Sequence, residues 1–551
     1  MNRHIGATNN GRLQRGSAFI MVLLLTLVAS AIGGTLLMMS GFDHRVAANE
    51  RDAEQSLQMA KAGVAYAYQL FDSGALSPTA AGVAFDSFAS GVSAALEGGE
   101  FTGTMSDLSS LMGQGQLYMI RSTGTFNGSS RTTEMVFQVI PDAFKFGYMA
   151  FNEATLHNHS GLAGPTFSID STIMSNGDVS VPAGLTINGT IVSANDVSIA
   201  AGSTIKRDIF ANKVTNAGTI EGDVKLVTSV IKLDPSASPY NRIDAQGNRY
   251  NWINGNSVPG TLSGAGTVLG STSSYTVQNG DVFAVDLFNR NGILLPDPDV
   301  NVTKYINPPL IDYKAMKAEA DLNDPTYFTS RADLVNYLIT KRVDETINGR
   351  AVKTVKVGTP SAPEFLYVDA DVTLTFVASG TDSAASGRVV ADALFIEGGI
   401  YTSGDFDFDG PNFVAASPAY PLPPDYYMLK INALPYCYPA LLAYSEPASG
   451  SLATWNPTDT PVLGTGSKID MSAGGDEGPA MFNGLVFAQD DIHMHHTKDP
   501  KEVIRFNGAE LGWKLHNCDY FKFSYDPQVR CTRFFVSGAG DSGIVSYREI
   551  R

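Results

Sequence analysis

The chain has 551 residues, of which 44% are hydrophobic, so it is long enough for several domains with buried cores and is not a disordered protein. Its formal net charge of −17 argues against a nucleic-acid partner, because neutralising phosphates requires clusters of Lys and Arg, and none occurs beyond the short N-terminus. Three cysteines are too few for a disulfide-built scaffold. Abundant glycine, with runs rich in Val, Ile, Thr and aromatic residues, predicts a mainly β body.

The N-terminus combines a basic start with a long apolar stretch. Residues 1–16 contain Arg3, Arg12 and Arg15, and the uncharged stretch from Ser17 to Ser40 follows at once. A helix of about 20 residues spans a bilayer, and flanking positive charge stays on the cytoplasmic side. The sequence therefore predicts a single membrane-spanning helix, a cytoplasmic N-terminus and an extracytoplasmic head.

The alternative is a cleavable secretory signal, for which Ala29-Ser30-Ala31 offers a small-residue cleavage site. The apolar run is longer than the roughly 7–15 residues of such a signal, and a helical pattern continues beyond it. That pattern is an apolar stripe at Val46, Ala53, Leu57, Ala60, Val64, Ala67 and Phe71. We expect one helix from about Ser17 to Phe71, with Gly33-Gly34 as its weak point.

Two stretches of this segment resemble the N-terminus of type IV pilins, and within that superfamily the PilX-type minor pilins. They are Arg12-Leu-Gln-Arg-Gly16 followed by Ser17-Ala-Phe-Ile-Met-Val-Leu-Leu-Leu, and residues 49–63, Asn-Glu-Arg-Asp-Ala-Glu-Gln-Ser-Leu-Gln-Met-Ala-Lys-Ala-Gly. The resemblance implies a leader peptide over residues 1–16, cleavage by a prepilin peptidase between Gly16 and Ser17, and a pilin helix over residues 17–74. It also implies an inner-membrane location and packing against other pilins or pseudopilins.

One departure from the family pattern narrows the role. Major pilins carry a glutamate close to the new N-terminus, at the position where this chain has Met21. The resemblance therefore implies a minor pilin or pseudopilin, of a type IV pilus or a type II secretion assembly, rather than a bulk fibre subunit. Such a subunit presents its head for adhesion to a surface ligand or for priming assembly.

The body contains an internal repeat. Ile169, Ile173, Val179 and Val181 return as Ile187, Ile191, Val197 and Ile199, and shorter rungs begin at Ile205 and Ile220. Short strands with inward aliphatic residues at such a period predict a β-solenoid. Residues 188–199 align with residues 483–494, and residues 366–400 can supply further rungs.

These patterns divide the head into four regions. We expect a small pilin-like antiparallel sheet over residues 75–145 and a first solenoid part over 146–229. An insertion over 230–362, with helices at Asp312–Asp321 and Ser330–Arg342, then interrupts the solenoid. The second solenoid part and the C-terminal region occupy residues 363–551.

Three aspartates form a candidate Ca²⁺ site. Asp405, Asp407 and Asp409 alternate before a glycine, as in the first half of a calcium loop. The residue that should supply a bidentate glutamate is Ala416, so an acidic surface turn is the competing interpretation. We expect no other cofactor.

A second group of polar residues suggests an alternative function. Alternation along a strand places His493 and His495 on the solvent face, opposite Ile492 and Met494. Solenoids also host polysaccharide lyases and hydrolases, for which the candidate acids are Asp369, Asp371, Asp490 and Asp491. A membrane-anchored enzyme of this kind is the alternative to the pilin; we expect no enzymatic activity and no catalytic residues.

Cys518 and Cys531 enclose a short segment near the C-terminus. An exported domain allows such a pair to oxidise, and many pilins close a C-terminal loop with a disulfide. The resemblance therefore implies a Cys518–Cys531 bond. A bond to Cys437 and two unpaired thiols are the alternatives.

Overall fold

The computed structural model describes most of the chain in segments: residues 11–72, 76, 81–87, 99–108, 117–157, 168–175, 177–193, 195–227, 231–233, 252–254, 259–275, 285–288, 294–297, 309–311, 313–320, 326–410, 426–445, 466–471, 479–494, 504–518, 521–536 and 540–550. The chain forms two compact units, which are described separately. The first comprises Met1–Asp107, Met119–Val136 and Ile544–Arg551, and the second comprises Leu108–Tyr118 and Phe137–Gly543.

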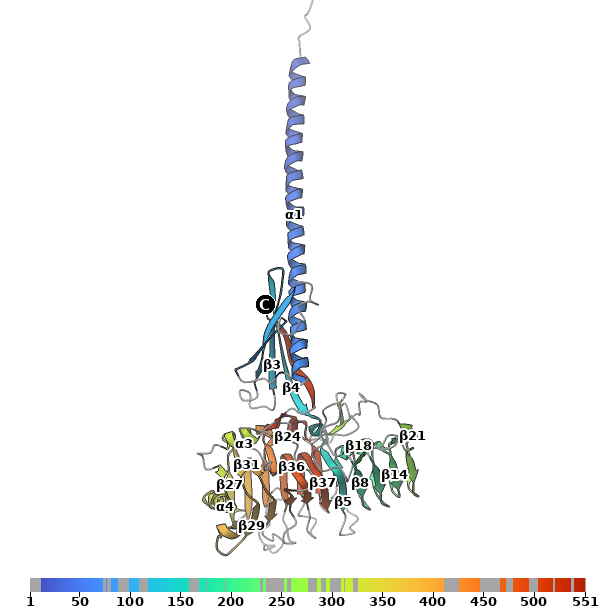
Figure 1. Ribbon diagram of the computed structural model, residues 1–551, viewed down its shortest axis with the longest axis vertical. Coiled ribbons are helices and arrows are strands. Elements are labelled where there is room, and N and C mark those ends of the chain that lie inside the picture. The colour runs from blue at the N-terminus through green and yellow to red at the C-terminus, as the bar shows by residue number, and fades with distance from the viewer. Residues whose placement is uncertain are drawn as a thin grey trace, which may run out of the picture. The chain divides into compact units, whose positions relative to one another are not determined.

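A single helix, α1 (Gly11–Asp72), dominates the first unit (Figure 1). It continues through Gly33-Gly34 without a break, so the expected weak point does not interrupt it. It also begins before the expected Ser17, since the Arg-Leu-Gln-Arg run at residues 12–15 consists of good helix formers.

Five strands form a separate sheet, in the order β1 (Val83–Asp86), β2 (Glu100–Asp107), β3 (Leu117–Phe126), β4 (Ser129–Pro141), β40 (Gly540–Ile550). Asn127 and Gly128, both with positive φ, make the tight turn between β3 and β4, as two-residue hairpins require.

The last strand, β40, corrects the expected domain boundary, because the C-terminus was expected to stay with the second solenoid part. It instead lies beside β4, where Arg548 Nε donates to Glu134 Oε1 at 2.8 Å. Along the chain, the solenoid residues thus lie between β4 and β40, two strands that are neighbours in this sheet. Nothing local to residues 540–550 distinguishes an edge strand of one sheet from another, so only the pairing itself decides it.

The second unit begins with a regular stack of short parallel strands that forms the first solenoid part. Its strands are β5 (Tyr148–His157), β6 (Ser168–Asp170), β7 (Ile173–Ser175), β8 (Asp178–Val181), β9 (Thr186–Ile187), β10 (Ile191–Ser193), β11 (Asp196–Ile199), β12 (Thr204–Ile205), β13 (Ile209–Ala211), β14 (Lys213–Asn216), β15 (Thr219–Ile220), β16 (Val224–Val227), β19 (Thr261–Ser263), β20 (Thr267–Val268) and β21 (Thr272–Tyr275). Ile173, Ile191 and Ile209 are register partners, which confirms the predicted repeat.

The second solenoid part is less regular. Its strands are β25 (Tyr327–Phe328), β26 (Arg342–Ile347), β27 (Arg350–Val357), β28 (Glu364–Val368), β29 (Val372–Val377), β30 (Arg388–Val390), β31 (Ala393–Thr402), β32 (Phe406–Asp409), β33 (Leu429–Asn432), β34 (Pro439–Ala443), β35 (Ile469–Asp470), β36 (Ala480–Met494), β37 (Ile504–Cys518) and β38 (Phe521–Tyr525). The two predicted helices are present as α3 (Tyr313–Glu319) and α4 (Arg331–Thr340).

Three small antiparallel pairs complete the second unit: β17 (Ile231–Leu233) with β18 (Trp252–Asn254), β22 (Val285–Phe288) with β23 (Leu294–Asp297), and β24 (Leu310–Ile311) with β39 (Phe535–Val536).

The two solenoid parts are separated in the chain, as expected, but they join in space into one continuous stack. Strand β37 pairs in parallel with β5, with Leu511 beside Met149 and Leu515 beside Ala154. Figure 1 shows β31, β36, β37, β5, β8 and β14 following one another along this stack. The chain enters the solenoid at β5 and builds the first half outward to β21. It continues at the opposite end with β25 and builds the second half back to β37 and β38, which pair with β5 and β6.

The region expected as an insertion over 230–362 contributes strands to both solenoid parts. Strands β25 and β27 fall within it and pair with β28 and β31. Strands β19, β20 and β21 stack on β14, β15 and β16. The inward aliphatic pattern fades there, since Thr272 and Ser274 stand beside Val224 and Leu226. The sequence repeat is therefore lost although the backbone repeat continues.

Candidate functional site

The first half of α1 exposes an unbroken apolar surface. Large apolar residues from Phe19 to Phe42 are exposed, reaching 76% at Leu37 and 78% at Met38. No charged residue occurs between Ser17 and Phe42. Among the described residues, α1 is the one helix long and apolar enough to cross a membrane. A surface of this kind is stable only in lipid or against other apolar helices.

Two threonine side chains within this surface bond to their own helix. Thr26 Oγ1 donates to the carbonyl oxygen of Val22 at 2.7 Å, and Thr35 Oγ1 donates to that of Ala31. Neither hydroxyl therefore needs water as a partner, which removes the cost of placing it in an apolar medium.

The second half of α1 packs on the five-stranded sheet. Ala60, Val64 and Ala67 from the predicted stripe are buried, with exposed fractions of 0–4%, which confirms the stripe there, whereas Val46 is exposed. Two glycines allow the close approach. A Cβ at Gly63 would lie 2.1 Å from Ser122 Oγ, and one at Gly124 would lie 2.2 Å from the carbonyl oxygen of Ser56.

The predicted cleavage residues lie in the first turns of α1. Gly16 and Ser17 both fall within its backbone, and their side chains are outside the described part of the structure. Met21 is 74% exposed among the other apolar residues of the helix. The helix therefore offers apolar contacts, and no carboxylate, at this position.

The three candidate calcium ligands lie at the edge of one rung. Asp405 precedes β32 and accepts from the backbone N–H of Lys468 at 2.9 Å, while Asp407 accepts from Thr373 Oγ1 at 3.1 Å. Burial raises the pKa of Asp407, and the charges of Asp470 and Asp405 raise it further. Among the described residues no group of three His, Cys, Asp or Glu side chains is placed to hold a metal ion. Asp405 and Asp407 thus hydrogen-bond to neighbouring rungs.

The histidine prediction is confirmed where the structure describes it. Ile492 and Met494 are buried and His493 faces outward, while His495 lies outside the described residues. The ring centroids of His493 and His516 are 5.9 Å apart, on neighbouring rungs. His516 Nδ1 also lies 3.5 Å from Asp491 Oδ2.

The four candidate acids of the enzyme alternative lie in two places, in turns between rungs and within β36. Asp369 accepts from Ser403 Oγ at 2.9 Å, and Asp371 accepts from the backbone N–H of Asp405 at 3.0 Å, so both stabilise turns between rungs. Asp490 and Asp491 follow each other in β36, and burial raises the pKa of Asp490.

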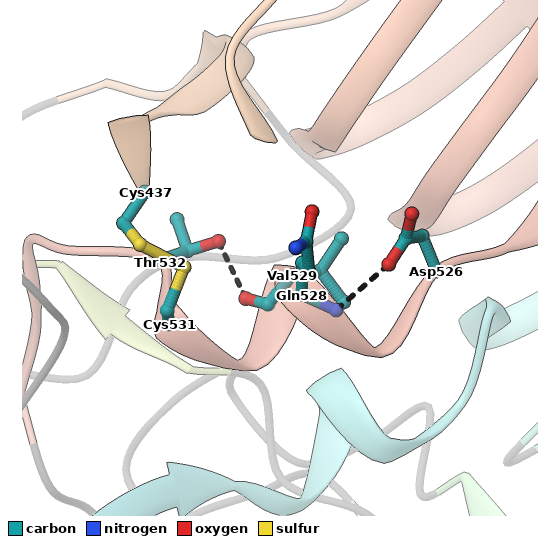
Figure 2. The surroundings of a disulfide bond; sticks show 6 residues. All are labelled: Cys437, Asp526, Gln528, Val529, Cys531 and Thr532. Atoms are coloured by element: carbon teal, nitrogen blue, oxygen red, sulfur yellow. Dashed lines mark hydrogen bonds between the residues drawn. A yellow bond between two sulfur atoms is a disulfide. The ribbon is translucent and has the colours of Figure 1, made fainter. Parts of the chain in front are cut away.

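The disulfide joins Cys437 to Cys531, so the predicted Cys518–Cys531 pairing is wrong (Figure 2). Cys437 ends the short helix η4 (Leu434–Tyr436), and Cys531 ends η5 (Pro527–Cys531), with the Cα atoms 5.2 Å apart. The turn that carries Cys531 is fixed by Asp526, which accepts from the N–H of Gln528 at 3.0 Å. Pairing follows from where these two helices meet rather than from closeness in sequence.

Side chains beside the disulfide join α3 to the two segments that carry Cys437 and Cys531. Arg533 Nη1 lies 3.2 Å from Glu319 Oε1 on α3, its guanidinium stacks on the ring of Tyr438, and the Tyr438 hydroxyl also donates to Glu319. The backbone N–H of Arg533 donates to the carbonyl oxygen of Cys437 at 2.8 Å. The disulfide is thus one part of a larger clasp.

Glu510 is a buried acid that no pattern in the sequence indicated. This side chain is 0% exposed in β37, and Asn517 Nδ2 donates to its Oε2 at 2.9 Å and to the hydroxyl oxygen of Tyr148 at 2.9 Å. Burial raises the pKa of Glu510 to about 8, although the hydrogen bond from Asn517 opposes the shift. Glu510 is thus a fully buried, hydrogen-bonded acid between β37 and β5.

Comparison with known proteins places the N-terminal segment. Residues 15–65 match the family model described as PilX N-terminal. No curated protein matches the chain. Among solved structures it is similar to the crystal structure of the competence-associated pilin ComZ from Thermus thermophilus, with 10% identity over 82% of this chain and 84% of that chain. The TM-score is 0.21, which is too low for that likeness to carry an argument. The family match covers the long helix that exposes its apolar surface, so this chain carries a PilX-type N-terminal segment.

Proposed function

We propose that this chain is a minor pilin or pseudopilin that α1 first holds in the inner membrane and then inserts among neighbouring pilin helices. A prepilin peptidase removes residues 1–16, and the solenoid is presented outside the cytoplasm for adhesion to a surface ligand or for priming assembly. The observation that carries the proposal is the division of α1 between an exposed apolar half and a half packed on a sheet. Neighbouring pilin helices are the partners that such a surface fits.

The disulfide supports the extracytoplasmic position of the head. Bonds such as Cys437–Cys531 persist in oxidising compartments and are rare in the cytosol. The basic residues Arg12 and Arg15 before the apolar stretch favour the same orientation.

Met21 supports a place at the fibre tip. A carboxylate in lipid costs roughly 2.5–3.5 kcal/mol on insertion scales, and a pilin recovers this only when a neighbour's N-terminal amine pairs with it. Met21 avoids the cost and gives up the pairing, which suits a subunit that lacks one neighbour. Quantitative proteomics of sheared fibres with gold-labelled heads should find few copies, at the ends. Labelling along the whole shaft at near-equal stoichiometry with a major pilin would contradict this.

Processing offers the sharpest test of the proposal. Mass spectrometry of the membrane-extracted chain from its own host should find an N-terminus at Ser17. Gly16→Leu should leave the leader attached, because a bulky residue replaces the glycine at the cleaved bond. Gly11→Leu, in the same leader but away from that bond, is the matched control and should be processed normally. A chain beginning at Ile32 would show an ordinary signal peptide and overturn the proposal.

A further inference from the structure

One end of the solenoid is an open rung. Strands β19, β20 and β21 pair on one side with β14, β15 and β16, and no strand in the described part of the chain pairs with their other side. Their outer edges therefore present unpaired backbone N–H and C=O groups, which form a template for another strand.

This rung covers the core behind it without being covered itself. Val214 and Ile220 are 0% exposed beneath their register partners Leu262 and Val268. Leu262 is itself 36% exposed, and Leu269, directly after β20, is 66% exposed. Apolar side chains and backbone polar groups thus share the end of the solenoid, a combination that strand addition would satisfy.

The end rung also lacks the charges that normally protect such an edge. Residues 250–280 contain no Asp, Glu, Lys, Arg or His, although 17% of the whole chain is charged. The preceding rung carries charged side chains, including the pair Lys225–Asp223 at 3.0 Å. Natural sheet edges are blunted by charge, whereas the centres of protein interfaces are depleted of it.

The opposite end of the solenoid has a different character. There α4 buries Leu334, Val335 and Leu338 against the solenoid core, next to β25, β27 and β30, and the outermost strand is β26, which pairs with β27 and carries Arg342, Asp344 and Glu345. Head-to-tail stacking would set this helix and these charges against the uncharged open rung. Two open rungs match each other instead, across a two-fold axis.

From these observations we propose that the open rung β19–β21 docks a second copy of this chain, edge to edge, in a two-fold dimer. The rotation reverses strand direction, so the edges pair antiparallel: one strand pairs with its own copy and the other two exchange partners. Each copy carries a net charge of −17 and repels the other elsewhere, while the uncharged rung lets two copies meet without like-charge contact.

Sedimentation velocity of the full chain in detergent micelles, over a range of concentrations, tests the dimer. The wild type should show a monomer–dimer equilibrium, and the double substitution Ser263→Lys with Leu269→Lys should raise its Kd at least about tenfold, because it places like charges at the contact. Ser198→Lys, on the exposed side of β11 two rungs behind the edge, is the matched control and should stay within about twofold of the wild type.

Hydrogen exchange distinguishes the occupants of the edge. Thr261 and Thr267 donate their N–H groups to the rung behind, so the alternate residues Leu262 and Val268 direct theirs to the outer edge. The amides of Leu262 and Val268 should be protected in the dimer and exchange rapidly in the monomer. Equal protection in the monomer would mean that another segment of this chain covers the edge. A dimer that the end-rung substitutions leave unchanged would mean association elsewhere, for example through α1. Either result, or a wild type that stays monomeric, would overturn the proposal and leave the pilin assignment untouched.

Discussion

The two halves of the solenoid reach the same backbone arrangement with different side chains. In the first half, the strands after β5 have two to four residues and stack columns of aliphatic side chains, such as Ile173, Ile191 and Ile209. In the second, β36 and β37 run for 15 residues each, and the core holds stacked rings. Phe506 lies between Phe482 and Phe523, with ring centroids 5.0 and 5.7 Å away. The parallel hydrogen-bonded register therefore defines this fold, and a repeating sequence is only one way of filling it.

The ring stack should carry more stability per residue than the aliphatic column. Phe506→Ala should cost about 3–5 kcal/mol, since it leaves a large cavity between two rings, whereas Ile191→Val in the first half should cost about 0.5–1.5 kcal/mol. Guanidinium denaturation of the full chain, followed by the fluorescence of Trp513 in β37, measures the first variant, and hydrogen exchange within β10 measures the second. If Phe506→Ala lowered the free energy of unfolding by less than Ile191→Val does, the second half would be loosely packed.

The disulfide should stabilise the second half alone. Cys437→Ser with Cys531→Ser should cost about 2–4 kcal/mol, because the bond closes a long loop in the unfolded chain. Cys518→Ser should change the free energy of unfolding little, because Cys518 is not part of this disulfide. Denaturation of the three proteins under oxidising conditions checks this. A loss caused by Cys518→Ser that matches the double variant would restore the Cys518–Cys531 pairing.

The junction between the halves should weaken as pH rises. Between the unfolded pKa near 4.5 and the folded pKa of about 8, the folded state keeps a proton on Glu510 that the unfolded state has lost. The stability contributed by this group is therefore complete below about pH 4.5 and falls towards pH 8. Relative to Glu510→Gln, which cannot titrate, the wild type should lose roughly 2 kcal/mol between pH 6 and pH 8. Parallel stability curves for the two proteins would show that Glu510 does not titrate there.

The smallest effect is expected on the outer face of the second half. Asp490→Asn with Asp491→Asn removes a partly exposed contact to His516, worth less than about 1 kcal/mol, and should leave piliation or secretion intact. Assembly assays measure piliation or secretion, and incubation of the purified chain with polysaccharides measures any enzymatic turnover. Turnover that disappears with the aspartates would favour the lyase or hydrolase instead.

Local periodicity was enough to predict the elements of this protein. A long apolar run with a basic flank predicted α1, and the stripe at Ala60, Val64 and Ala67 predicted the half that is buried. The spacing of Ile and Val predicted the first rungs, and the match between residues 188–199 and 483–494 correctly placed Val197 and Ile492 facing inward on distant rungs. These features depend on neighbours in the chain, so the sequence contains them directly.

Tertiary structure alone decided which distant segments meet. The pairing of β40 with β4, the junction of β37 with β5 and the Cys437–Cys531 bond all join residues far apart in the chain. Each contact depends on how many rungs lie between the two segments and on the lengths of the loops that connect them. No local sequence pattern contains that information. The burial of Glu510 follows from the same cause, because a single acid in a strand becomes buried only when β5 closes over it.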